Sequence, residues 1–357
     1  MLAIFGVIYH FVGGFASGSF YIPYQKVKQW AWESYWLVGG FFSWLIVPPI
    51  AAALTAPGYT TILESANPST LFYTYLMGLF WGIGGLTFGL AMRYLGLSLG
   101  MAITLGYCAA FGTLIPPIYY EIFGSASGEK TILQLLANTS GQVTLLGVMV
   151  CLVGIAICGR AGTMKEKELS AEQKQAQISE FNFPKGLVVA TFSGVLSAFM
   201  SFGFQTGKPI AQAVVNSGVD SLWQNNPVLV VILLGGLTTN LIWCVILNRR
   251  NHTSANYTDT RTPLGRNYLF SALAGTTWYL QFFFYGMGES QLSKTGFGFS
   301  SWTLHMAFII IISNAWGLYL NEWAGSSART KRLVFLGIAT VIFSTMLVGY
   351  GNYLAAN

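Results

Sequence analysis

Three side chains in this sequence can carry a proton within otherwise apolar segments. His10 and His305 each interrupt a hydrophobic run, and Glu33 opens another directly after Trp30 and Trp32. Imidazole exchanges a proton near neutral pH, and an ionisable group at membrane depth is costly enough to indicate a function. We therefore treat His10, Glu33 and His305 as candidate proton-coupling residues. The alternative is a neutral histidine bonded to a neighbouring helix, or a carboxylate at an interface.

A second candidate site is the densest aromatic run of the chain, residues 278–285 (WYLQFFFY). On a helix, Trp278, Gln281 and Tyr285 share one face. Aromatic rings pack against the C–H faces of a sugar, and an amide bonds its hydroxyl groups. Rings that face lipid or the protein core are the alternative, but an amide facing lipid would be unpaired. This face predicts a sugar-binding surface.

Other chemistries lack the residues they need. The sequence has no G-x-x-x-x-G-K-[ST] phosphate loop, no H-E-x-x-H metal motif and no G-x-S-x-G nucleophile elbow. The four cysteines lie inside apolar stretches without C-x-x-C spacing, which favours plain packing. We predict no enzyme activity, no catalytic residues, no metal site and no cofactor.

The composition indicates a membrane protein. Only 8% of the 357 residues are charged and 54% are hydrophobic, whereas soluble domains carry about 25% charged residues. Runs of about 20 apolar residues predict ten membrane spans, at 2–22, 34–54, 71–91, 96–118, 141–160, 186–206, 226–247, 267–288, 299–320 and 332–353.

The basic residues predict an orientation. Fifteen of the 18 Lys and Arg fall in or beside the odd-numbered connections, and only Lys130, Lys208 and Lys294 lie in the even-numbered ones. Positive charge marks the cytoplasmic side, so both termini are predicted to lie outside. The net charge of +6 is explained in this way, without a nucleic-acid partner.

The chain divides into two similar halves. We predict a first five-helix repeat at 1–160, a polar cytoplasmic linker at 161–185 and a second five-helix repeat at 186–357. Phe15-Ala16-Ser17-x-x-Phe20 recurs as Phe199-Met200-Ser201-x-x-Phe204, and Phe80-Trp81 aligns with Thr277-Trp278. With five spans each, the halves enter the membrane from opposite sides. The predicted fold is an all-α polytopic membrane protein, with ten transmembrane helices as two inverted five-helix repeats.

The repeat extends the predicted sugar site. Trp81 is the counterpart of Trp278, and Gln205 is the counterpart of Tyr21. Asn240 is a further polar position within a span. The full set of substrate-binding candidates is Tyr21, Trp81, Gln205, Trp278, Gln281 and Tyr285.

The segment Phe20 to Glu33 (FYIPYQKVKQWAWE) carries a family signature. Together with Trp81-Gly82-Ile83-Gly84, Met92-Arg93-Tyr94-Leu95-Gly96, the run 278–285 and Ser301-Trp302-x-Leu304-His305-Met306, it resembles the L-rhamnose–proton symporter family of the drug/metabolite transporter superfamily. These pieces span the chain in the family's order. Gln25 and Gln29 depart from it, since lysine is common there.

The resemblance implies secondary active import of a 6-deoxy sugar, most simply L-rhamnose, by proton symport with alternating access in a bacterial inner membrane. It implies that the proton gradient supplies the energy and that His10, Glu33, Gln281 and His305 are functional positions. The partners expected are the sugar and membrane lipid. The alternative is a related carrier of another sugar, a metabolite or a drug, and the oligomeric state stays open.

Overall fold

The computed structural model describes residues 2–123, 131–169, 180–293 and 301–356. Within these ranges the chain is helical and contains no strand. The predicted linker 161–185 is described only at its two ends. Lys130, Lys174 and Lys294 lie outside the described residues.

The first half contains five long helical segments. They are α1 (Leu2–Ser19), the segment formed by α3 (Trp32–Gly40), the π-helix η1 (Phe41–Ile46) and α4 (Val47–Thr55), then α6 (Pro68–Leu95), α7 (Leu97–Phe123) and α9 (Thr139–Glu168). Short helices α2 (Tyr21–Tyr24), α5 (Tyr59–Ser65) and α8 (Ile132–Leu136) lie between them.

The second half begins with α11 (Phe183–Ser197), which continues into α12 (Phe199–Thr206) and α13 (Lys208–Asn216). The remaining helices are α14 (Asn226–Arg250), α15 (Leu264–Ser293), α16 (Ser301–Tyr319) and α17 (Ala328–Ala356), with short 3-10 helices η2 (Ser221–Trp223) and η3 (Ser254–Tyr257).

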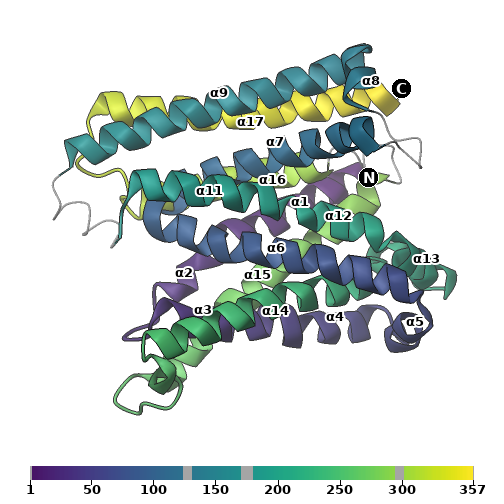
Figure 1. Ribbon diagram of the computed structural model, residues 1–357, viewed down its shortest axis with the longest axis horizontal. Helices are drawn as coiled ribbons and strands as arrows, with labels where there is room; N and C mark the ends of the chain where they lie inside the picture. Colours follow the sequence, from purple (N-terminus) through teal and green to yellow (C-terminus); the bar gives the residue numbers. More distant parts are fainter. Residues whose placement is uncertain (1, 124–130, 170–179, 294–300, 357) are drawn as a thin grey trace.

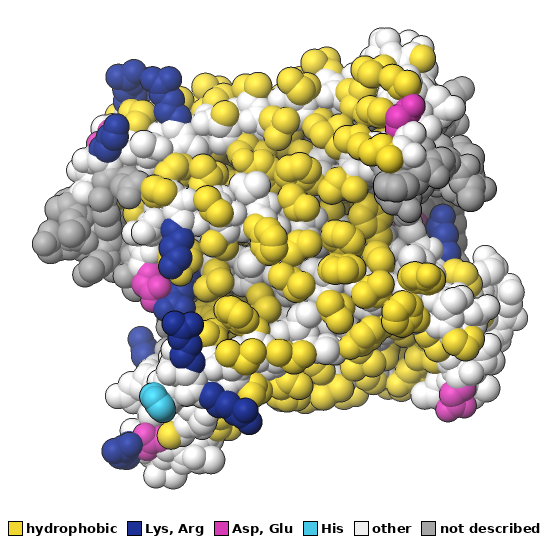
Figure 2. Space-filling view, viewed as in Figure 1, with side chains coloured by type: hydrophobic (Ala, Val, Ile, Leu, Met, Phe, Trp, Pro, Cys, Tyr) yellow, Lys and Arg dark blue, Asp and Glu magenta, His cyan; other side chains and the backbone are white. Residues whose placement is uncertain are grey.

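Length and composition support a multi-pass membrane protein. Six helical stretches of the described chain are long and apolar enough to cross a bilayer, and two shorter apolar helices lie at Leu97–Gly112 and Leu304–Tyr319. Figure 2 shows a broad apolar surface over the middle of the molecule, with Lys and Arg side chains gathered mainly at its left-hand end. This pattern matches a lipid-facing band with one positively charged rim.

The helices form a layered bundle (Figure 1). α9 and α17 lie along each other at one edge, and α1, α6, α11 and α15 cross its middle. Glycines allow the closest crossings, because a Cβ at Gly275 of α15 would overlap the backbone of Gly39 in α3. A Cβ at Gly78 of α6 would likewise overlap the carbonyl of Ile232 in α14. Close packing through small residues is how membrane helices associate.

One helix irregularity positions an aromatic side chain in the middle of the bundle. The π-helix η1 ends two residues before the pair Pro48 and Pro49, which have no N–H for the regular helical ladder. It places Trp44, which is 1% exposed, against Trp36 and Trp278, with ring centroids 6.4 and 5.4 Å away.

The connection from α1 to α3 is docked against the first turn of α15 and against the connection that precedes it. The backbone N–H of Lys28 donates to the Asn267 side chain at 2.9 Å, and the Asn267 amide donates back to the Lys28 carbonyl at 2.8 Å. The N–H of Ala31 donates to the side chain of Asn256 at 2.9 Å. Trp30 and Trp32, on either side of Ala31, are buried against protein.

Candidate functional site

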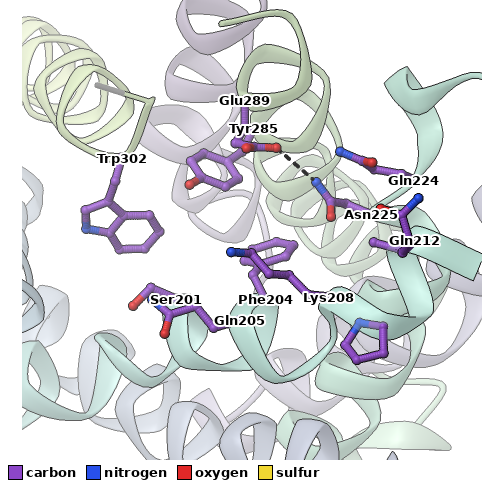
Figure 3. Close-up of a pocket in the computed structure, with 12 residues that line it drawn as sticks. Ser201, Phe204, Gln205, Lys208, Gln212, Gln224, Asn225, Tyr285, Glu289 and Trp302 are labelled. Atoms are coloured by element: carbon purple, nitrogen blue, oxygen red, sulfur yellow. Dashed lines mark hydrogen bonds between the residues drawn. The ribbon is translucent and has the colours of Figure 1, made fainter. Parts of the chain in front are cut away.

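A wide pocket lies at the end of α12, and we call it the Tyr285 pocket (Figure 3). Its volume is about 740 Å³. Figure 3 shows Tyr285 and Glu289 of α15 on one wall, Trp302 of α16 beside them, and Gln205 of α12 on the opposite wall. The complete lining is Ser201, Phe204, Gln205, Lys208, Pro209, Ala211, Gln212, Gln224, Asn225, Tyr285, Glu289 and Trp302.

This lining combines rings with hydrogen-bonding groups. Phe204 and Tyr285 pack with ring centroids 5.6 Å apart, and Trp302 stands edge-on to Tyr285 at 5.7 Å. Four carboxamides, from Gln205, Gln212, Gln224 and Asn225, line the same space. Each amide offers both donors and an acceptor. A small polyhydroxylated molecule with an apolar edge suits this surface.

Lys208 and Glu289 add one charge of each sign. Lys208 begins α13 and extends into the pocket in Figure 3. Glu289 accepts a hydrogen bond from the side chain of Asn225 at 3.4 Å. The two formal charges cancel within the pocket, which disfavours a strongly charged ligand such as a nucleotide sugar.

A smaller central cavity of about 50 Å³ adjoins this pocket, because Trp302 lines both. Trp81, Trp278 and Gln281 line it, together with Ser17 of α1. The ring centroids of Trp81 and Trp278 are 6.0 Å apart. The Gln281 side chain is 6% exposed, and its amide nitrogen has no hydrogen-bond partner among the described residues. A buried unpaired amide is costly and is available to a ligand.

The structure thus brings most of the predicted substrate residues together. Trp278, Gln281 and Tyr285 follow one another along α15, so that two of them face the central cavity and the third faces the Tyr285 pocket. Trp81 joins them from α6 and Gln205 joins from α12. Tyr21 does not, since it lines a separate pocket of about 420 Å³ with Arg93 and Glu180, which we call the Arg93 pocket.

His10 and His305 meet in the middle of the bundle. Their rings lie 5.7 Å apart, and both side chains are fully or almost fully buried. Tyr285 contacts both rings, at 5.5 Å from His10 and 5.3 Å from His305. Neither ring nitrogen of His10 has a hydrogen-bond partner in the described part of the chain. Tyr285 therefore connects two predicted proton sites to the predicted sugar site.

Glu33 lies in a different place. Its carboxylate accepts hydrogen bonds from the Asn251 amide at 3.0 Å and the Thr253 hydroxyl at 2.8 Å. These partners belong to the turn after α14, and all three residues line another pocket of about 370 Å³. The structure separates Glu33 from the histidine pair.

Sequence reasoning missed several residues of the Tyr285 pocket. Gln212, Gln224 and Asn225 lie between the sixth and seventh predicted spans, in a segment that was not predicted to be a span. Trp302 appears in the sequence only as part of a family motif, and its place in both cavities comes from the packing of α16. The segment 208–216 forms an amphipathic helix. Its helical spacing of apolar residues was the sequence signal that could have located Gln212 on a polar face.

Comparisons with known proteins identify a family that this chain resembles along its length. A sequence model of the family described as "L-rhamnose-proton symport protein" matches residues 2–355. The chain is 39% identical over 349 residues to the L-rhamnose-proton symporter of Cronobacter sakazakii (strain ATCC BAA-894), covering 97% of each protein. It is 38% identical over 351 residues to that of Yersinia pestis (strain Pestoides F), covering 98% of each.

Proposed function

Because the chain belongs to the L-rhamnose-proton symport protein family, we propose that it imports L-rhamnose together with a proton across a bacterial inner membrane. The family match along residues 2–355 carries this proposal. The chain is a transporter in this proposal, with the proton gradient as its energy source.

The Tyr285 pocket suits this sugar. L-rhamnose has a methyl group at C6, which gives the ring one apolar edge beside its hydroxyl groups. The Phe204, Tyr285 and Trp302 rings can take the apolar surface, and the Gln205 amide can bond hydroxyls from the opposite wall. The central cavity, with Trp81, Trp278 and Gln281, is the next space along the path. A carrier for a cationic drug has less support, because the single carboxylate of this pocket faces a lysine.

We assign the chain ten membrane spans arranged as an inverted repeat, with the halves at 1–160 and 186–357. The helix partners support this assignment: α1 packs on α15 and α16, and α11 packs on α6 and α7 in the same way. In the proposed repeat α1 corresponds to α11, α6 to α15 and α7 to α16, so the two sets of contacts are equivalent. Gly78 and Gly275, each three residues before Trp81 or Trp278, make equivalent close crossings with α14 and α3. A repeat of this kind places the substrate between its halves.

The positively charged rim in Figure 2 supports the predicted orientation. With that rim in the cytoplasm, both termini are periplasmic. The Tyr285 pocket then faces the periplasm, and the Arg93 pocket faces the cytoplasm.

The His10–His305 pair is the proposed proton site. Its rings share Tyr285 with the sugar pocket, so that a proton on an imidazole and a sugar in the pocket act on the same side chain. Coupling requires that both ligands favour the same conformation. Glu33 takes the role of docking α3 on the turn at 251–253 through its two hydrogen bonds.

Uptake of labelled L-rhamnose into proteoliposomes tests the function. With an acidic exterior and one proton per sugar, a gradient of about two pH units allows up to about a hundredfold accumulation, since each unit corresponds to a factor of ten. A protonophore should abolish accumulation. L-mannose, which carries a hydroxyl on the C6 methyl of rhamnose, should compete poorly. Uptake that is insensitive to the protonophore would refute proton coupling, and absence of rhamnose uptake would refute the function.

A further inference from the structure

The Arg93 pocket is built from the same parts of the fold as the Tyr285 pocket. Its lining comes from the end of the first predicted span, the start of α3, the end of α6 and the start of α7, with Glu180 and Glu322 from the connections. The Tyr285 pocket is lined by the end of α12, the approach to α14, the end of α15 and the start of α16. In the proposed repeat these are equivalent elements.

Individual residues match as well as elements. When Phe20 is aligned with Phe204, Tyr21 falls on Gln205, and each residue lines its own pocket. When Trp81 is aligned with Trp278, Met92 falls on Glu289, and these two also line the corresponding pockets. The two pockets are therefore counterparts at the two ends of the repeat.

A line of aromatic contacts connects the Arg93 pocket to the central cavity. Tyr21 packs edge-on against Phe20 at 5.6 Å, and Phe20 stacks on Trp278 at 4.8 Å. Trp278 lines the central cavity, which Trp302 shares with the Tyr285 pocket. Both pockets thus lead to the same cavity through single aromatic layers.

The Arg93 pocket carries the chemistry of a sugar site. Tyr21, Trp30, Trp32 and Tyr35 supply rings, and Gln25 supplies an amide. The Trp30 side chain is 8% exposed, and its indole N–H has no hydrogen-bond partner among the described residues.

Arg93 and Glu180 form an ion pair in this pocket, and both side chains stay partly exposed, at 33% and 41%. A guanidinium and a carboxylate are planar groups that hold neighbouring hydroxyls.

Building on the proposed function, we propose that the Arg93 pocket is a second L-rhamnose subsite, occupied by the sugar as it leaves for the cytoplasm. The Arg93 guanidinium donates to sugar hydroxyls and the Glu180 carboxylate accepts from them, while the rings of Trp30 and Trp32 contact its C–H face. Arg93 and Glu180 bind the sugar on this side only, because the Tyr285 pocket contains neither residue.

Sided transport measurements test this subsite. In membrane vesicles of right-side-out and inside-out orientation, rhamnose exchange gives a separate KM for each face. Arg93→Gln removes a charged donor, so we expect the KM at the Arg93 face to rise about tenfold. The KM at the opposite face should stay within about twofold.

Two further variants complete the experiment. Glu180→Gln should also raise the KM at the Arg93 face. Because Glu180 lies in an exposed connection, its substitution should not prevent folding, so this variant replaces Arg93→Gln if that protein does not fold. Arg261→Gln is the matched control, because Arg261 forms an ion pair with Asp259 in the 251–263 connection, outside the pocket. It should leave both KM values unchanged.

The outcomes are distinguishable. If wild-type protein exchanges rhamnose but the Arg93 and Glu180 variants change neither KM, or change both equally, the subsite is refuted while the proposed function stands. If wild-type protein exchanges no rhamnose at either face, the proposed function itself fails.

Discussion

Replacing Gln281 by leucine should make the sugar-free protein more stable and its sugar binding weaker. In the structure the Gln281 amide nitrogen is buried in the central cavity without a hydrogen-bond partner among the described residues. An unsatisfied buried donor costs ~1–3 kcal/mol. Leucine removes that donor and leaves some volume unfilled, so we expect a net gain of about 1 kcal/mol in the free energy of unfolding. For a chain of this size that gain corresponds to about 2 °C in Tm.

The same substitution removes a donor to the sugar. If a rhamnose hydroxyl accepts from Gln281 during transport, losing that bond costs about 1.4 kcal/mol, or about tenfold in Kd. Thermal unfolding in detergent, with and without L-rhamnose, measures both effects on one sample. The stabilisation by rhamnose should shrink while the baseline Tm rises.

Gln291→Leu is the matched control for this prediction. Gln291 lies on the same helix and is also buried, at 8% exposed, but its amide is not among the unpaired groups and it lines none of the cavities described above. It should neither raise Tm nor change rhamnose binding. A lower Tm with unchanged binding in Gln281→Leu would show that the Gln281 amide has a structural role, and the reasoning would be wrong.

Three further outcomes are expected. His305→Gln should reduce accumulation of rhamnose to equilibrium while exchange continues within about threefold, and loss of accumulation in Glu33→Gln instead would move the proton site. Asn240→Ala should lower the free energy of unfolding by ~2–3 kcal/mol in a thermal denaturation series without changing the rhamnose KM, and a changed KM would contradict this. The Asn240 side chain accepts from the indole of Trp36 at 2.9 Å and donates to the carbonyl of Gly82 at 3.0 Å, and hydrogen bonds within membranes contribute up to ~1–2 kcal/mol each. Burial raises the pKa of the Glu322 carboxyl above 4.5, although hydrogen bonds from two backbone N–H groups act in the opposite direction. Because the folded protein then holds this proton more tightly than the unfolded chain, the contribution of Glu322 to stability falls as the pH rises above about 4.5. Glu322→Gln should therefore flatten the decline of Tm with pH above about 4.5, and an unchanged slope would exclude this carboxyl as its cause.

The face formed by Trp278, Gln281 and Tyr285 could be predicted because it depends on local geometry alone. A helix turns by a fixed angle per residue, so residues at i, i+3 and i+7 share a side whatever surrounds them. In the structure Trp278 and Gln281 line the central cavity and Tyr285 lines the Tyr285 pocket.

The partners of that face could not be predicted in the same way. His10 and His305 come from opposite ends of the chain, and their contact depends on α1 packing against α15 and α16. Asn240, a polar candidate by sequence, proves to be fully buried and bonded to two neighbouring segments. A polar residue within a span signals that some partner exists, but the partner is chosen by the helix that covers it.

Tyr21 shows the limit of the repeat argument. In the proposed repeat Tyr21 corresponds to Gln205, yet the two residues line different pockets, at opposite ends of the molecule. If the proposed inverted repeat holds, corresponding residues lie on opposite sides of the membrane unless they are near its middle, which is where Trp81 and Trp278 would meet.

The sequence by itself determined that this chain is a helical membrane protein, and it supplied the positively charged side and the family. These properties are sums over many residues, since burial in lipid needs long apolar runs and topology needs only a bias of charge. The tertiary structure alone decided which polar groups share a cavity. Contacts between helices depend on where glycines permit close approach, as Gly39, Gly78 and Gly275 do here, and on side chains far apart along the chain.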